Sequence, residues 1–94
     1  MNTTLHIISR HLEPSTLATL RRSLNAGDGL LLSCDGVYLA LQADFMPADY
    51  PCMALACDVE ARGLSGLWPA PVALVDHTGF VDLCLRHTKS LSWA

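Results

Sequence analysis

Cysteine, histidine and aspartate side chains follow the apolar runs of this sequence, at the points where strands are expected to end. A cysteine becomes a nucleophile as its thiolate, which requires a nearby base or cation and a third group that orients the base. Such residues together would supply nucleophilic thiol chemistry at one edge of a sheet. The candidates are His11, Cys34, Asp35, Cys57, Asp58, Asp76 and His77.

The three aspartates also have a structural explanation. Asp35 and Asp58 stand where helices are expected to begin and are predicted to cap them, and Asp76 caps the last helix either directly or through Thr78. His77 is the better functional histidine, although a loop histidine beside an aspartate is common without any role. The carboxylates alone therefore do not establish a catalytic group.

The four cysteines divide into two pairs. Cys52 is expected at the start of a strand and Cys84 on the apolar stripe of the last helix, so both are predicted to lie in or near the core. Cys34 and Cys57 fall where a strand gives way to a helix N-terminus, where the helix dipole favours a thiolate. Each of these two is either a reactive thiol or a small buried residue.

No motif in the sequence indicates a metal or a cofactor. The cysteines show no C-x-x-C and no paired metal spacing. His6 lies inside a strand and is predicted to be a hydrogen-bonded core histidine. Gly27-Asp28-Gly29 precedes a strand instead of opening a helix, so the dinucleotide-binding fingerprint fails. Neither a bound metal nor a cofactor is expected.

The elements that would position these residues alternate between strands and helices. Short apolar runs predict strands at 5–9, 30–33, 52–57 and 72–75, and a short edge strand is expected in the tail 89–94. Apolar spacing predicts a helix within 15–29 with Gly27 as its stop, a short helix at 59–62, and a last helix through Phe80, Leu83, Cys84 and His87. Strands that are apolar throughout are typical of a parallel sheet covered on both faces. We therefore expect one small α/β domain over residues 1–94, with a parallel sheet of four to five strands and helices on both faces.

Composition limits the possible partners. With a formal net charge of −3 and a pI near 5.6, the chain lacks the positive charge that drives non-specific nucleic-acid binding. The start of the chain does not resemble a signal peptide, and no run is long enough for a membrane helix, so a cytoplasmic protein is expected.

Apolar residues make up 51% of the sequence and charged residues only 16%. In a small domain this balance predicts apolar surface that a partner subunit covers. Trp93, and Phe45 and Tyr50 in the irregular 42–51 segment, are the predicted interface residues, and Trp68 is expected in an exposed loop.

Several stretches together resemble the DsrH/TusB family of sulfur-relay proteins. They are "LHIISRH", "GDGLLLSCDGVYLAL", "DVEARGLSG" and "VALVDHTGFVDLCLRHTKSLSW", which cover nearly the whole chain. The most specific pieces are D-G-V at 35–37, A-R-G at 61–63, the aspartate-aromatic pattern at 76–80, and Trp93.

The resemblance implies a subunit that joins TusC-like and TusD-like proteins in a heterohexamer with two copies of each. Such a complex takes persulfide sulfur from a TusA-like carrier and passes it to a TusE-like protein, for 2-thiolation of wobble uridine in certain tRNAs. A related branch serves dissimilatory sulfur oxidation. No direct contact with nucleic acid or membrane is implied.

The resemblance also bears on the cysteines. TusD-like relatives carry the reactive cysteine at the end of the third strand, and counting back from Gly63 reaches Leu55, with Cys57 two residues later. Some DsrH-type relatives have a cysteine on the first helix, which here contains none. The implied role is a non-catalytic, assembly-forming subunit with no catalytic residue, in which Cys34 is expected to pack as a small apolar residue. The alternative is a thiol enzyme or persulfide carrier that uses Cys57 or Cys34 itself, with His77 or His11 nearby.

Overall fold

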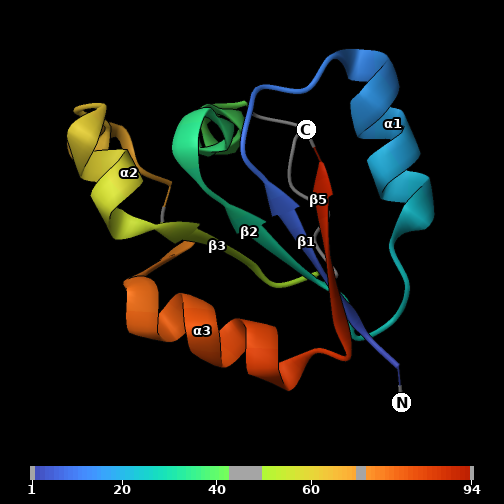
Figure 1. Ribbon diagram of the computed structural model, residues 1–94. Coiled ribbons are helices and arrows are strands. Elements are labelled where there is room, and N and C mark those ends of the chain that lie inside the picture. Colours follow the sequence, from blue (N-terminus) through green and yellow to red (C-terminus); the bar gives the residue numbers. More distant parts are fainter. Residues whose placement is uncertain (1, 43–49, 70–71, 94) are drawn as a thin grey trace.

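The chain forms a five-stranded parallel sheet with helices packed on both faces (Figure 1). The computed structural model describes residues 2–42, 50–69 and 72–93. The strands are β1 (Thr4–Ile8), β2 (Gly29–Leu32), β3 (Cys52–Leu55), β4 (Ala73–Val75) and β5 (Lys89–Trp93). The helices are α1 (Pro14–Ser23), α2 (Ala56–Ala61) and α3 (His77–Arg86), with 3-10 helices η1 (Cys34–Leu41) and η2 (Ser65–Leu67). The predicted fold class is confirmed.

The order of strands across the sheet is β4-β3-β2-β1-β5, and every neighbouring pair runs parallel. All four residues of β2 are buried, because this strand lies in the middle of the sheet with side chains packed on both faces. The expected tail strand is present as β5, which pairs with β1 so that Ile8 lies opposite Trp93.

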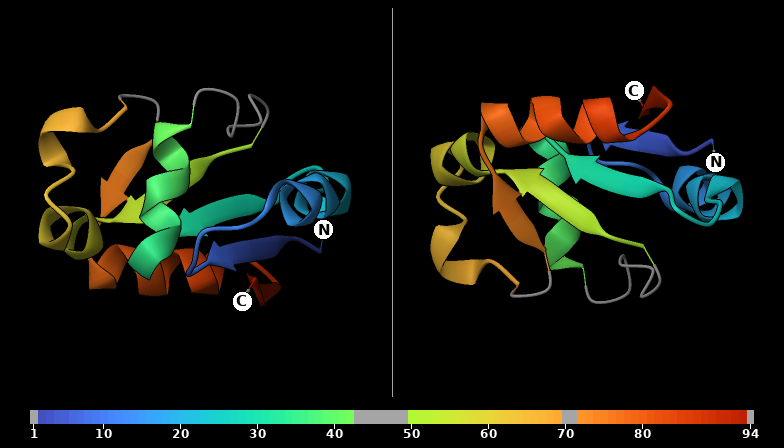
Figure 2. Two further views of the ribbon diagram at one scale, coloured as in Figure 1. Left: turned by 90° about the horizontal axis from the view of Figure 1, so that it is seen from above. Right: turned by 90° about the horizontal axis from the view of Figure 1, so that it is seen from below.

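Side chains on the two faces of the sheet form two separate apolar clusters. The larger cluster joins the sheet to α1, η1 and α2, and includes Leu20, Val37 and Val59. The smaller cluster joins the sheet to α3 through Leu83, with Phe80 packed against it. Figure 1 shows this division directly, with α3 below the strands and with α1 and η1 above them, and Figure 2 shows α3 on the face opposite η1.

Helix α1 begins where the sequence predicts but ends earlier. Pro14 occupies its first turn, where a missing backbone N–H costs nothing, and Leu17 and Leu20 are its buried residues. The helix ends at Ser23, because the backbone of Leu24 is already extended. Gly27, which was expected to stop the helix, instead has a φ of 89° in the turn that leads to β2.

The third strand is shorter than predicted, and this changes the position of two candidate residues. The apolar run at 52–57 was interpreted as one strand, but β3 ends at Leu55 and α2 begins at Ala56. An unbroken apolar run fits a strand and the start of a helix equally well, so hydrophobicity could not mark this boundary. As a result Cys57 lies in the first turn of α2, and Asp58 lies inside the helix instead of capping it.

Candidate functional site

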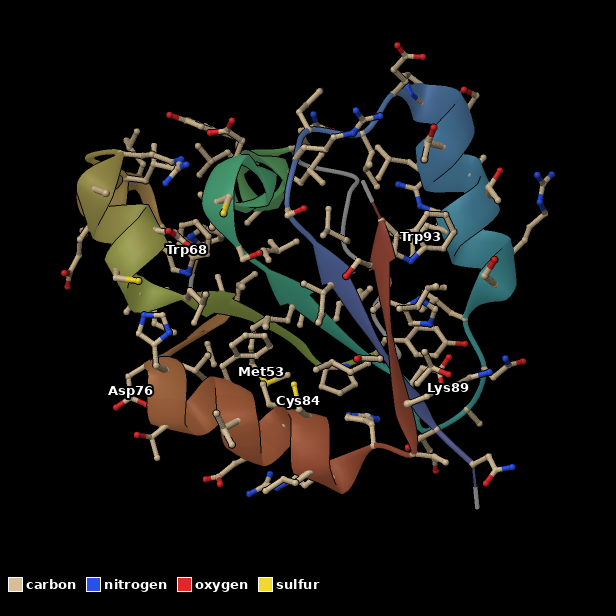
Figure 3. All side chains as sticks on the ribbon, in the orientation of Figure 1. Met53, Trp68, Asp76, Cys84, Lys89 and Trp93 are labelled. Carbon is tan, nitrogen blue, oxygen red and sulfur yellow. The ribbon has the colours of Figure 1, made fainter. Side chains whose placement is uncertain are left out.

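Parallel strands bring the residues that follow them to one edge of the sheet. Cys34 follows β2 as the first residue of η1, Cys57 follows β3 in α2, and His77 follows β4 as the first residue of α3. Figure 3 marks this edge by Asp76, which is labelled at the start of α3. The expected gathering at the carboxyl ends of the strands is therefore present for these three residues.

Cys34 occupies an unusual turn at this edge. Its φ is 48°, which makes it the only described residue other than glycine with a positive φ. Its backbone N–H donates to a carboxylate oxygen of Asp58 at 2.8 Å, so the carboxylate of α2 holds the turn that opens η1. The thiol is exposed, and the described residues offer its sulfur no hydrogen-bond partner. The expectation that Cys34 packs as a small buried residue is wrong.

Arg62 links η1 to α2. Its Nε and Nη2 both donate to the same oxygen of Asp35, each at 3.0 Å, and its Nη1 donates to the backbone carbonyl of Asp58 at 3.2 Å. The hydrogen bond to Asp35 raises the pKa of the Arg62 guanidinium, and the charges of Asp35 and Asp58 act in the same direction. Asp35 was predicted to cap a helix; it instead binds an arginine from the neighbouring element.

Gly36 completes this arrangement because no larger residue fits its place. A Cβ at this position would lie 2.0 Å from the backbone oxygen of Ile8. The same oxygen accepts the backbone N–H of Ser33 at 2.9 Å, so β1 and the start of η1 are in close contact. Val37, the next residue, is fully buried. Four residues thus hold η1 against α2 and β1, and we call them the structural bracket: Asp35, Gly36, Asp58 and Arg62.

Cys57 and His77 are in contact across the edge. The Cys57 sulfur lies 3.7 Å from Nε2 of His77, within hydrogen-bonding distance for sulfur. Both residues are exposed. Asp76 does not complete a triad, because its side chain caps α3 by accepting the backbone N–H of Gly79 at 2.8 Å. The capping role predicted for Asp76 is confirmed, and the predicted cysteine, histidine and aspartate set is reduced to a pair.

Among the described residues, His11, Cys52 and Cys84 form no hydrogen bond with this pair. His11 is exposed in the segment between β1 and α1. Cys52 is buried, as predicted, and burial raises the pKa of its thiol to about 12. Cys84 is partly buried and packs on the α3 side of the sheet, where Figure 3 shows it beside Met53. Among residues 2–42, 50–69 and 72–93 no three His, Cys, Asp or Glu side chains gather in a way that would hold a metal ion.

A buried polar network is centred on His6, the middle residue of β1. His6 is 2% exposed, as expected for a core histidine, and its Nε2 lies 3.1 Å from Asp28. The indole N–H of Trp93 donates to Nδ1 of His6 at 3.0 Å. Because tryptophan only donates, Nδ1 must accept, and the proton on Nε2 then points to Asp28. The network ties β5 to the interior of the sheet.

Asp28 is the residue of this network that the sequence did not indicate. Its carboxylate accepts the backbone N–H groups of Thr4 at 2.9 Å and of Asn25 at 3.0 Å, besides its contact with His6. Burial alone would raise the pKa of Asp28, but these hydrogen bonds and the nearby histidine outweigh it, and the pKa is lowered from its ordinary value of 3.8. The only available signal was a charged residue directly before a fully apolar strand.

The lowered pKa predicts how stability depends on pH. A carboxylate with a lowered pKa in the folded state contributes stability that is full above its ordinary pKa and is lost as the pH falls through the folded value. We therefore expect wild type to be more stable than Asp28→Asn at pH 7 and this difference to shrink at about pH 3. Urea unfolding of both proteins at the two pH values measures it, and a difference independent of pH would contradict the assignment.

The two predicted interface residues that the structure describes also contact the chain's own core. Trp93 and Tyr50 are partly buried and pack against the larger apolar cluster, and the Tyr50 hydroxyl donates to the carbonyl of Leu24 at 3.4 Å. Phe45 lies outside the described residues. Trp68, expected in an exposed loop, is partly buried, and its indole N–H donates to the carbonyl of Val72 at 2.8 Å.

The chain is a small α/β protein with a parallel sheet and helices on both faces. Proteins of this class place their functional sites at the carboxyl ends of the strands, and here two exposed cysteines lie there. A family model described as "DsrH like protein" matches residues 11–90, and the chain belongs to this family of sulfur-relay proteins.

Known proteins of the family match the chain along its length. It is 34% identical over 94 residues to "Protein TusB" of Enterobacter sp. (strain 638), 36% to that of Escherichia fergusonii and 35% to that of Escherichia coli (strain K12). Each match covers 95% of this chain and 99% of the relative. Among solved structures, the ychN protein from E. coli has a TM-score of 0.70 at 16% identity, covering 99% of this chain and 100% of that one, which shows a shared fold.

Proposed function

We propose that this chain is a non-catalytic subunit of a heterohexameric TusBCD-type sulfurtransferase complex. In this role it assembles with TusC-like and TusD-like subunits in the cytoplasm, and the complex relays persulfide sulfur from a TusA-like to a TusE-like carrier for 2-thiolation of the tRNA wobble uridine. The catalytic cysteine then belongs to a partner subunit, and this chain contacts neither nucleic acid nor membrane.

The observation that carries the proposal is the bracket. Two of the segments that carry the family resemblance, D-G-V and A-R-G, supply Asp35, Gly36 and Arg62, and these residues hold η1 against α2 and β1. An active site presents its characteristic side chains to a substrate, whereas these residues contact one another. These residues of the D-G-V and A-R-G segments therefore maintain the shape of the subunit.

The surface supports assembly with partners. Several large apolar side chains are exposed on different elements, which is unfavourable for a chain that stays alone in water. They are Tyr38, Leu41, Leu67, Leu74, Val81, Leu85 and Leu91, with Leu85 78% exposed. In α3 the outer face carries Val81 and Leu85, one helical turn apart. We place the contact surfaces at such residues together with Trp93, Tyr50 and Phe45.

Sulfur transfer by the assembled complex is expected to be independent of both exposed thiols of this chain. Cys34→Ser and Cys57→Ser, each reconstituted with the partner subunits, should transfer radiolabelled sulfur to the TusE-like acceptor at a rate within about twofold of wild type. The reason is that the cysteine that carries the sulfur belongs to the TusD-like subunit and is unchanged. Replacement of the TusD-like cysteine is the matched control and should abolish transfer. Loss of transfer with either serine variant in an intact complex would show that this chain is catalytic.

One observation favours a second candidate, a chain that carries sulfur itself. Of the two exposed cysteines, Cys57 alone has a histidine within reach, at 3.7 Å. The serine variants decide between the two candidates, because a carrier on the transfer route would lose activity when its thiol is replaced. A subunit of a dissimilatory sulfur-oxidation complex would have the same fold and related partners. The two pathways differ in the protein that accepts the sulfur, so testing which acceptor receives sulfur from the complex distinguishes them.

A further inference from the structure

We infer that Cys57 and His77 form a reactive-thiol site that takes up sulfane sulfur from a persulfide. The site is built on two separate elements, the first turn of α2 and the first residue of α3, which β3 and β4 bring side by side. The choice of a persulfide as the substrate class rests on the proposed function, whereas the reactivity of the thiol rests on the geometry alone.

The other three cysteines of the chain can be compared with Cys57. The four cysteines are all described and unpaired, and two of them are exposed, Cys34 and Cys57. Burial raises the pKa of the Cys52 thiol to about 12, and Cys84, a residue of α3, is half-buried against the sheet, so neither is an exposed thiol. Exposure alone would make Cys34 and Cys57 equally reactive.

The two exposed thiols differ because only Cys57 has a base close to its sulfur. The Cys57 sulfur lies 3.7 Å from Nε2 of His77, and an imidazole nitrogen at this distance is positioned to take the thiol proton. At Cys34 the neighbouring carboxylate of Asp58 is occupied by the backbone N–H of that cysteine and by Arg62. Cys57 is therefore the thiol that the fold activates.

The transfer step is balanced without an oxidant. Nε2 of His77 takes the proton of the Cys57 thiol, and the sulfur attacks the terminal sulfur of a persulfide R–S–SH. A new S–S bond forms to Cys57, the S–S bond of the donor breaks, and the inner sulfur leaves as a thiolate that recovers the proton from His77. The products are a Cys57 persulfide and the thiol R–SH, with no net change in oxidation.

The Cys57 site is not a step of the proposed relay. Since the complex is proposed to transfer sulfur through a cysteine of its partner, the Cys57 site takes up sulfur without being required for turnover. Exposure of both residues at an edge of the sheet leaves the sulfur open to a small donor. No other pair of the described residues combines an exposed thiol with a histidine in hydrogen-bonding distance.

The test treats the full chain with limiting glutathione persulfide and follows the gain of one sulfur atom by intact mass spectrometry, with fragmentation to locate it. We expect the sulfur on Cys57, formed at least about tenfold faster than on Cys34. Cys34→Ser should retain this rate and Cys57→Ser should lose it. His77→Ala should slow it by about tenfold or more, and added imidazole should restore part of the loss.

Two further measurements separate the possible failures. Circular dichroism shows whether His77→Ala is folded, and iodoacetamide measures the reactivity of each thiol without any sulfur donor. Equal rates at Cys34 and Cys57, or a wild-type rate in folded His77→Ala, would overturn the site. A Cys57 thiol that iodoacetamide alkylates preferentially but that gains no sulfur would overturn the persulfide assignment. Assembly with partner subunits is measured separately, so a failure of the proposed function is distinguishable from a failure of this site.

Discussion

Replacing Gly36 with alanine is expected to lower the free energy of unfolding by about 3 kcal/mol, the upper end of the cost of overpacking. The added Cβ would lie 2.0 Å from the carbonyl oxygen of Ile8, a backbone atom that a change of rotamer cannot move. To make room, β1 and η1 must separate, which loosens the packing of Val37. Urea unfolding of the variant and of wild type measures the difference.

Gly66→Ala is the matched control for this prediction. Gly66 lies in η2, and a Cβ added there meets no atom within 4 Å, so its stability should change by less than about 0.5 kcal/mol. If Gly36→Ala were as stable as Gly66→Ala, the close contact between β1 and η1 would be wrong. The packing of η1 against β1 would then not explain why D-G-V at 35–37 is typical of the family.

Asp28→Ala is expected to lower the free energy of unfolding by roughly 3 kcal/mol or more, because three donors lose their acceptor. These donors are the backbone N–H groups of Thr4 and Asn25 and the Nε2 of His6. The side chain is 2% exposed, so water does not readily replace the lost oxygens. Chemical denaturation at pH 7 checks the size of the effect.

Asp82→Ala provides the comparison for Asp28→Ala. Asp82 is an exposed residue of α3, and its removal should change stability by less than about 0.5 kcal/mol. Hydrogen exchange adds a local readout, since loss of Asp28 should also free His6 and weaken the hold on Trp93, with faster exchange along β5. A variant as stable as wild type, with unchanged exchange in β5, would contradict the network.

The sequence predicted the layers of the fold because hydrophobicity is sufficient for that purpose. The run of leucines at 30–32 could only be a buried central strand, and Leu17 and Leu20 placed one face of α1 on the sheet. Element boundaries were less accessible, since the alanine and cysteine at 56–57 suit a strand as well as a helix. That one boundary decided whether Cys57 ended a strand or opened a helix.

The sequence could predict where the site lies in the fold but not which side chains contact one another there. Parallel topology brings the ends of β2, β3 and β4 together, so the expectation of cysteines and His77 at one edge was correct. The partner of each aspartate depends on side-chain geometry between elements far apart in the chain. For this reason Asp35 was interpreted as a helix cap when its partner is Arg62, 27 residues away.

The most direct test of the account is the native mass of this chain when it is produced together with TusC-like and TusD-like subunits. One subunit carries a purification tag, and size exclusion with light scattering gives the mass of the purified material. The account predicts a single stable hetero-oligomer that contains this chain, with a mass equal to two copies of each subunit. Recovery of this chain as a separate, soluble monomer that leaves the other two subunits unbound would contradict it.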